Sequence, residues 1–209
     1  MTRSAVVVGA LLLATSPLLA AKTFSQDDVH TMVGFRAGTV LFDVPGHFDR
    51  FKITLTGDPD DLAKAKARVE IETASVNTGN PKRDDHLRSA DFFDATQYKA
   101  IVFESTKVAI EGGKLLVTGT LDMHGKKETV TIPFDVVQAK NGAGLDTTGY
   151  RGSLTLKNST FGIGDQSVAA KISLKDEVVL DVLLVGQWEA PKAEAAKPAA
   201  KDAKGGKKK

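Results

Sequence analysis

The residues best suited to chemistry are four histidines and the charged run Arg83-Asp84-Asp85-His86. An imidazole beside a carboxylate could move protons to and from a substrate, which is general acid–base catalysis. The competing interpretation is that Asp84 and Arg88, four residues apart on a short helix, brace that helix. The sequence contains no Gly-x-Ser-x-Gly segment, no phosphate-binding glycine loop and no dinucleotide fingerprint. We therefore expect a binding protein and not an enzyme.

The histidines also bear on metal binding. His30, His47, His86 and His124 lie far apart in the sequence, with no His-x-His pair and no pair at helical spacing. A zinc site needs three or four ligands that converge on one point. The chain has no cysteine, which excludes a disulfide scaffold, a thiolate metal site and a cysteine nucleophile. The sequence thus predicts neither a metal nor a cofactor.

The charge of the chain is unevenly distributed. The formal net charge is +2, but residues 190–209 hold seven lysines and only two acidic residues. Residues 22–189 carry 20 basic and 24 acidic residues, so the body of the protein is slightly acidic. Nucleic-acid binding needs a basic face for phosphate contacts. We expect no nucleic-acid partner.

Apolar and polar residues alternate in most of the chain, which is typical of half-buried strands. Short glycine-containing turns, such as Gly112-Gly113 and His124-Gly125, separate these segments. About eight strands joined in this way favour an antiparallel barrel or a sandwich, and the alternation alone leaves both open. We also expect a turn, with one helical turn, within residues 57–65. The predicted strands fall in residues 29–36, 51–55, 67–73, 101–105, 115–121, 130–136, 152–156 and 178–188.

The alternation stops in residues 75–94. Asn80-Pro81 ends the preceding strand, because proline cannot donate to a ladder and restricts the residue before it. Residues 82–89 are charged and predict a short helix. Phe92 and Phe93 follow, and we expect both rings to turn inward and close one end of the structure that the strands build.

The same stretch resembles the YceI family. Two further segments match: Asp27 or Asp28 with His30 and Phe35, and later Phe161-Gly162-Ile163. The resemblance covers residues 22–189. It implies a mainly all-β fold, an extended eight-stranded antiparallel lipocalin-like β-barrel with one or two short helices, that binds isoprenoid or other amphiphilic lipids in the periplasm. The residues that match most closely are Ser75, Thr78, Arg83, Asp84, His86, Leu87, Arg88, Ser89, Asp91, Phe92, Phe93, Asp94, Ile101, Phe103 and Ser105.

A barrel of this size can hold one small ligand or be filled by its own side chains, and both interpretations stay open at this point. If there is a cavity, a lipid tail would gain roughly 0.8 kcal/mol for each buried CH₂ group. Candidate head-group contacts are His30, Arg83 and His86; the alternative is that the motif around Arg83 only fastens the crossover to the barrel. The candidate pocket residues are Phe35, Phe51, Ile71, Phe92, Phe93, Phe103, Leu121, Phe134, Leu154, Phe161 and Val182.

The two ends of the chain have their own compositions. Residues 1–21 have a basic start, an apolar stretch and small residues at Ala20 and Ala21, which is typical of a signal peptide. Residues 190–209 are rich in Ala and Lys and predict a disordered tail. Such a tail is either merely solvated or makes a weak contact with an anionic membrane surface.

The sequence therefore predicts a periplasmic protein that binds, transports or sequesters an amphiphilic isoprenoid lipid, polyprenyl or quinone-like. The alternative is an exported, stress-related interaction or structural barrel with no dedicated ligand. The last predicted strand, residues 178–188, is apolar on both faces. A helix or a second subunit would have to cover its outer face, so a homodimer is a candidate assembly.

Overall fold

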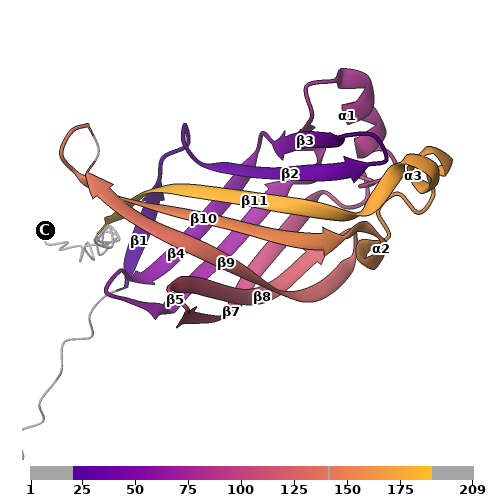
Figure 1. Cartoon of the computed structure of the whole chain (residues 1–209). Coiled ribbons are helices and arrows are strands. Elements are labelled where there is room, and N and C mark those ends of the chain that lie inside the picture. Colours follow the sequence, from indigo (N-terminus) through magenta and orange to yellow (C-terminus); the bar gives the residue numbers. More distant parts are fainter. Residues whose placement is uncertain (1–20, 141, 190–209) are drawn as a thin grey trace, which may run out of the picture.

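Eleven strands form one antiparallel sheet in the computed structural model, which describes residues 21–140 and 142–189 (Figure 1). The strands are β1 Lys22–Gln26, β2 Met32–Thr39, β3 Asp43–Phe48, β4 Phe51–Asp58, β5 Asp61–Glu72, β6 Val76–Asn77, β7 Ala100–Glu111, β8 Lys114–Met123, β9 Lys126–Lys140, β10 Asp146–Lys157 and β11 Leu174–Glu189. The helices are the 3₁₀ turn η1 Thr73–Ser75 and the α-helices α1 Pro81–Arg88, α2 Asn158–Phe161 and α3 Val168–Ser173.

Eight of these strands close into a ring. The order is β1-β4-β5-β7-β8-β9-β10-β11, and β11 pairs back onto β1. The strands β2, β3 and β6 continue the sheet from the other half of β11. The prediction of a mainly β, eight-stranded antiparallel barrel with few short helices is confirmed.

The closing contact is made by the short strand β1. Thr23 pairs with Thr56 of β4 and with Glu189 of β11. Gly186 of β11 faces β1 so closely that a Cβ atom there would lie 2.1 Å from the Ser25 carbonyl oxygen. Only glycine leaves room for this approach of two backbones.

The first predicted strand, residues 29–36, begins only at Met32 as β2, and the short strand β1 before it was not predicted. Asp27 accepts a hydrogen bond from the Val29 amide through its side chain, at 2.9 Å, and this turn separates β1 from β2. Val29 lies in the turn and is 85% exposed, whereas Thr31 and Val33 are buried.

The predicted helical turn within residues 57–65 is wrong, because β5 begins at Asp61 and continues as a strand to Glu72. The ladder between β4 and β5 shifts register between Thr56 and Asp58, so β5 carries extra residues at that point. The bulge places Leu62 and Ala65, three residues apart, on the same inner face, a spacing that imitates a helix.

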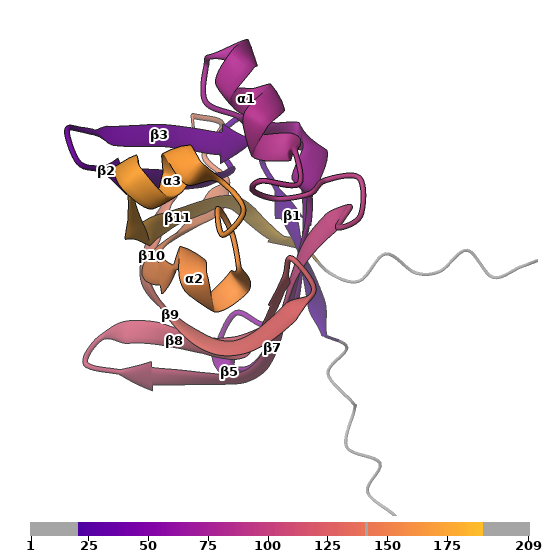
Figure 2. The ribbon, with the colours of Figure 1, turned by 90° about the vertical axis from the view of Figure 1, so that its right-hand side faces the viewer.

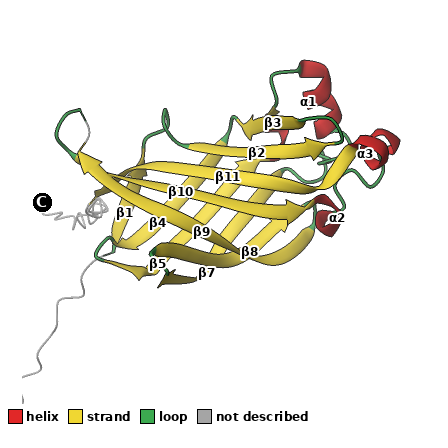
Figure 3. Ribbon diagram, viewed as in Figure 1, coloured by secondary structure: helices red, strands yellow, loops and turns green. Residues whose placement is uncertain are grey.

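The three α-helices lie together at one end of the barrel (Figure 3). Viewed from that end, α2 lies across the opening and α1 and α3 lie at its rim (Figure 2). Toward the other end of β11, Trp188 pairs with Phe24, and the Phe24 ring meets the rings of Trp188 and Tyr150 edge-on at 5.4 and 5.6 Å. Each end of the barrel is thus narrowed by its own set of side chains.

No helix within residues 21–140 and 142–189 is long and apolar enough to cross a membrane. The predicted signal peptide, apart from Ala21, and the predicted tail of residues 190–209 lie outside the described residues. Both interpretations stay predictions.

Replacing Gly186 with alanine tests the barrel closure. The added methyl group collides with the β1 backbone, so we expect Gly186→Ala to lower the free energy of unfolding by roughly 1–3 kcal/mol, as overpacking does. Gly142→Ala is the control, because a Cβ atom there has nothing within 4 Å. Urea titration measures both variants, and equal midpoints would contradict a closure limited by this contact.

Candidate functional site

The inward faces of the strands enclose two adjoining apolar chambers. The barrel chamber, with a cavity volume of about 110 Å³, lies among β4, β5 and β7 to β11. The helix-side chamber, of about 100 Å³, lies between the barrel and the segment around α1. Since a single water needs roughly 10–15 Å³ on this measure, each chamber has room for a ligand group.

The two chambers meet at a waist, which is formed by Val33, Ile71, Leu121 and Leu180. Leu180 projects inward from β11 but is only half-buried. An inward side chain keeps exposed surface only if the space beside it is unfilled. The two chambers therefore adjoin at these side chains, and the interior there is not a solid core.

Polar groups are nearly absent from the lining. Tyr150 is the only residue of the barrel chamber with a polar side chain, and its hydroxyl accepts a hydrogen bond from Trp188 Nε1 at 3.0 Å. Burial raises the pKa of Tyr150, so its hydroxyl stays neutral. In the helix-side chamber Asn158 donates to the Lys175 carbonyl at 3.3 Å. The hollow suits a hydrocarbon chain and offers no charge to a polar ligand.

Nine of the predicted pocket residues line this hollow. Phe35, Phe92 and Phe93 line the helix-side chamber. Phe103, Phe134, Leu154 and Val182 line the barrel chamber, and Ile71 and Leu121 belong to both. The inward turn expected of Phe92 and Phe93 is present, because the Phe93 amide donates to the Leu87 carbonyl at 3.0 Å and turns the chain back under α1.

The structure places the other two predicted pocket residues elsewhere. Phe161, at the end of α2, is 1% exposed and lines neither chamber, because α2 carries it across the barrel opening. Its carbonyl oxygen lies 2.9 Å from Nδ1 of His124. Phe51, at the start of β4, is half-buried against the hydrophobic core and borders a separate pocket with Gln26 and Met32.

The three candidate head-group residues do not line either chamber. His30 lies in the turn after β1, 2.8 Å from Asp27, and its hydrogen bond lowers the pKa of that carboxyl group. His86 on α1 lies 2.9 Å from Asp91. The His86 ring also meets the Phe92 ring edge-on at 4.9 Å, so His86 touches the wall of the helix-side chamber.

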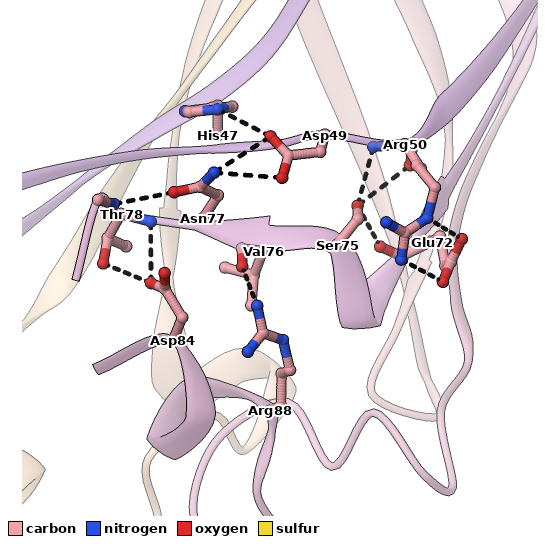
Figure 4. Close-up of polar contacts among 11 residues, drawn as sticks. His47, Asp49, Arg50, Glu72, Ser75, Val76, Asn77, Thr78, Asp84 and Arg88 are labelled. Carbon is pink, nitrogen blue, oxygen red and sulfur yellow. Dashed lines mark hydrogen bonds and ion pairs between the residues drawn. The ribbon is translucent and has the colours of Figure 1, made fainter. Parts of the chain in front are cut away.

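The motif residues of α1 fasten the helix to the segment before it (Figure 4). Arg83 donates to the hydroxyl and to the carbonyl oxygen of Thr78, at 2.7 and 2.9 Å. The Thr78 hydroxyl in turn donates to Asp84, and so does the Thr78 amide. The expected mutual bracing of Asp84 and Arg88 is wrong. Their side chains reach back to different parts of the preceding backbone instead.

Arg88 and its neighbours complete this attachment. Arg88 donates to the carbonyl oxygens of Ala74 and Val76 at 2.7 and 2.8 Å. Ser75 accepts from the Arg50 amide at 3.1 Å and donates to the Glu72 carbonyl at 2.7 Å. These contacts hold η1, β6 and α1 against the edge of the barrel (Figure 4).

Some lining residues were missed because bulges reverse the alternation. Phe103 and Val108 both line the barrel chamber although they are five residues apart on β7. The β7–β8 ladder shifts register between Ser105 and Lys107, which turns the following residues over. The hydrophobicity of Val108 was a signal, but a strict period of two assigns it to the outer face.

Comparisons with known proteins agree with this architecture. The family model described as the YceI-like domain matches residues 24–185. A UPF0312 protein of Vibrio parahaemolyticus is 34% identical over 137 residues, which cover 64% of this chain and 72% of the relative. The crystal structure of BcnA from Burkholderia cenocepacia has a TM-score of 0.69 at 32% identity, covering 78% of this chain and all of that one (100%). A polyisoprenoid binding domain from Saccharophagus degradans has a TM-score of 0.58 at 19% identity, covering 83% and 99%.

The Arg83→Ala variant distinguishes a structural role of Arg83 from a contact between Arg83 and a lipid head group. The variant loses two hydrogen bonds to Thr78, so we expect a lower melting temperature, equivalent to about 1–2 kcal/mol, with unchanged lipid affinity. The control is Lys82→Ala on the same helix, because the Lys82 side chain is exposed and forms no ion pair with the described residues. Thermal melts and lipid titrations measure both quantities. A large loss of affinity with an unchanged melt would instead assign Arg83 to the ligand.

Proposed function

The chain belongs to the YceI-like domain family, and we propose that it binds an amphiphilic isoprenoid lipid, polyprenyl or quinone-like, with the tail in the two chambers. The observation that carries this proposal is the pair of adjoining chambers, which are lined almost entirely by apolar side chains. Each CH₂ group that leaves water for this lining contributes roughly 0.8 kcal/mol. A tail of several units therefore supplies ample binding energy without polar contacts.

The choice of an isoprenoid is supported by likeness of fold. The Saccharophagus degradans domain, which shares the barrel, is a polyisoprenoid binding domain. An elongated hollow with a waist suits a single long chain better than a compact ligand. Branched and aromatic side chains dominate the lining, and such surfaces pack well against a methyl-branched tail.

The head group belongs at the helix-bearing end. Of the three candidates, His86 is the one in contact with a lining residue, Phe92. Arg83 already donates to Thr78, and His30 lies in a turn beside Asp27. We assign His86 the first contact with a polar head group and give no such role to Arg83 or His30. His30 lies between Asp27 and Thr31, which both bond Val185, far along β11 from the helices.

Lipid binding at this site is tested by filling the waist. Leu180→Trp projects an indole into the junction of the chambers, and we expect the long-chain adduct in native mass spectra to fall at least tenfold. Leu183→Trp is the matched control, since Leu183 lies on the same strand and borders a groove on the outer surface.

Two outcomes would contradict the proposal. An unchanged adduct in Leu180→Trp would place the lipid elsewhere. A wild-type protein that carries no adduct, when purified from its own host, would favour the alternative of an exported barrel with no dedicated ligand.

Export to the periplasm is part of the same proposal. Its support is the composition of residues 1–21, with Arg3, an apolar stretch and small residues at Ala20 and Ala21. We expect the mature chain in the periplasmic fraction, with its first residue at position 21 or 22. Cell fractionation followed by N-terminal sequencing measures this, and an intact Met1 in the cytoplasmic fraction would disprove it.

A further inference from the structure

Five large apolar side chains are exposed at the helix-bearing end of the barrel. Val40, Leu41 and Phe42, in the turn between β2 and β3, are 69%, 87% and 62% exposed. Val168 and Ile172, one turn apart on α3, are 72% and 75% exposed. We call this set the apolar tip.

The turn and the helix form one surface. The Val40 amide donates to the carbonyl oxygen of Ser173, the last residue of α3, at 3.0 Å. Thr39 of β2 pairs with Leu174 of β11 directly beside this bond. In Figure 2 the β2–β3 turn projects from the rim next to α3. The exposed side chains therefore share a protruding corner and not a groove.

The backbone amides of the turn between β2 and β3 are all hydrogen-bonded within the protein, as an environment without water requires. The Thr39 hydroxyl accepts from the amides of Leu41 and Phe42, at 3.3 and 3.0 Å. The Thr39 amide donates to the Phe42 carbonyl at 2.9 Å, and the Val40 amide is bonded to Ser173. All four amides have partners, so the turn can enter an apolar phase without leaving a donor unpaired.

Two long cationic side chains lie beside the tip. Lys171 on α3 and Lys175 on β11 are exposed and form no ion pair with the described residues. The Lys175 stem lies along Gly38, next to the tip, which leaves its ammonium group free to reach outward. The acids in the same segments are Asp43, Asp165, Asp176 and Glu177, and the Asp176 carboxylate already accepts from the amide and hydroxyl of Ser159. Long cationic side chains around an apolar centre are typical of surfaces that dock on membranes.

The tip also adjoins the ligand cavity. Ala37, two residues before Thr39, and Leu174, the first residue of β11, both line the helix-side chamber. A membrane touched by the tip would lie close to that chamber. We propose that the apolar tip inserts into the surface of a lipid bilayer, and, resting on the proposed function, that lipid enters and leaves the helix-side chamber there.

Because the chain has no cysteine, a single introduced cysteine can be labelled at a chosen position. Leu41→Cys and Ile110→Cys, each labelled with an environment-sensitive dye, place a probe on the tip and on an exposed residue of β7. The vesicles contain phosphatidylcholine, phosphatidylglycerol and a nitroxide-labelled lipid. We expect the dye at position 41 to shift to the blue and to be quenched severalfold, while the dye at position 110 is unchanged. A dye at position 41 that stays in water would overturn the proposal.

Acidic substitutions on the apolar tip test its contribution to the affinity for vesicles. Leu41→Asp with Phe42→Asp should weaken vesicle binding at least tenfold at high salt, where attraction by the lysines of residues 190–209 is screened. The matched control is Val29→Asp with Ile110→Asp, because these side chains are 85% and 65% exposed, against 87% and 62%. The control should bind as the parent chain does, and equal binding by both double variants would refute docking by the tip.

Two further readouts separate the alternatives. A parent chain that sediments as a dimer, and becomes a monomer in the tip variant, would show that a second copy covers the tip and would overturn the proposal. Native mass spectra report the lipid adduct independently. Loss of vesicle binding with the adduct retained supports docking as a separate step, whereas a parent chain without an adduct that still docks would remove only the proposed function.

Discussion

Closure of the barrel by β1 is the constraint on which the hollow depends. This strand of five residues pairs with β4 on one side and with β11 on the other. An open sheet would expose a row of unpaired backbone groups and would admit water to the apolar lining. The close approach of β1 to Gly186 and the edge-on contacts of Phe24 with Tyr150 and Trp188 secure this seam. Once it is closed, inward side chains can leave space unfilled without collapse of the sheet.

The segment around α1 covers the helix-side chamber, which the ring of strands alone leaves open. Hydrogen bonds from Arg88 to the backbone of β6 and its neighbour, and from Thr78 to Asp84, hold the helix in place. Phe92 and Phe93 then form part of the chamber wall. The charged motif thus supports the wall of the helix-side chamber.

Seven of the eight strands of the ring were predictable, because alternation reports directly which face of a strand is buried. The closing strand β1 was missed, and the strand predicted at residues 29–36 is β2, which lies outside the ring. The errors have local causes. Bulges in β5 and β7 reverse the alternation, which produced the false helical turn near Leu62 and concealed Val108. The roles of Asp84 and Arg88 depend on backbone groups outside the helix, to which helical spacing gives no clue. For Phe161, burial was foreseeable, but its placement in α2 across the opening follows only from how the barrel end is closed.

Because space at the waist is unfilled, the stability of the fold depends on whether a ligand fills that space. Side chains beside a void lack contact partners, so the empty form forgoes dispersion energy that a bound chain would restore. By mass action, a ligand present at a hundred times its dissociation constant stabilises the native state by about 2.7 kcal/mol. Quality-control proteases degrade the less stable population faster. On the proposed function, the loaded chain would be degraded more slowly than the empty one, so that the abundance of the protein would follow the supply of lipid.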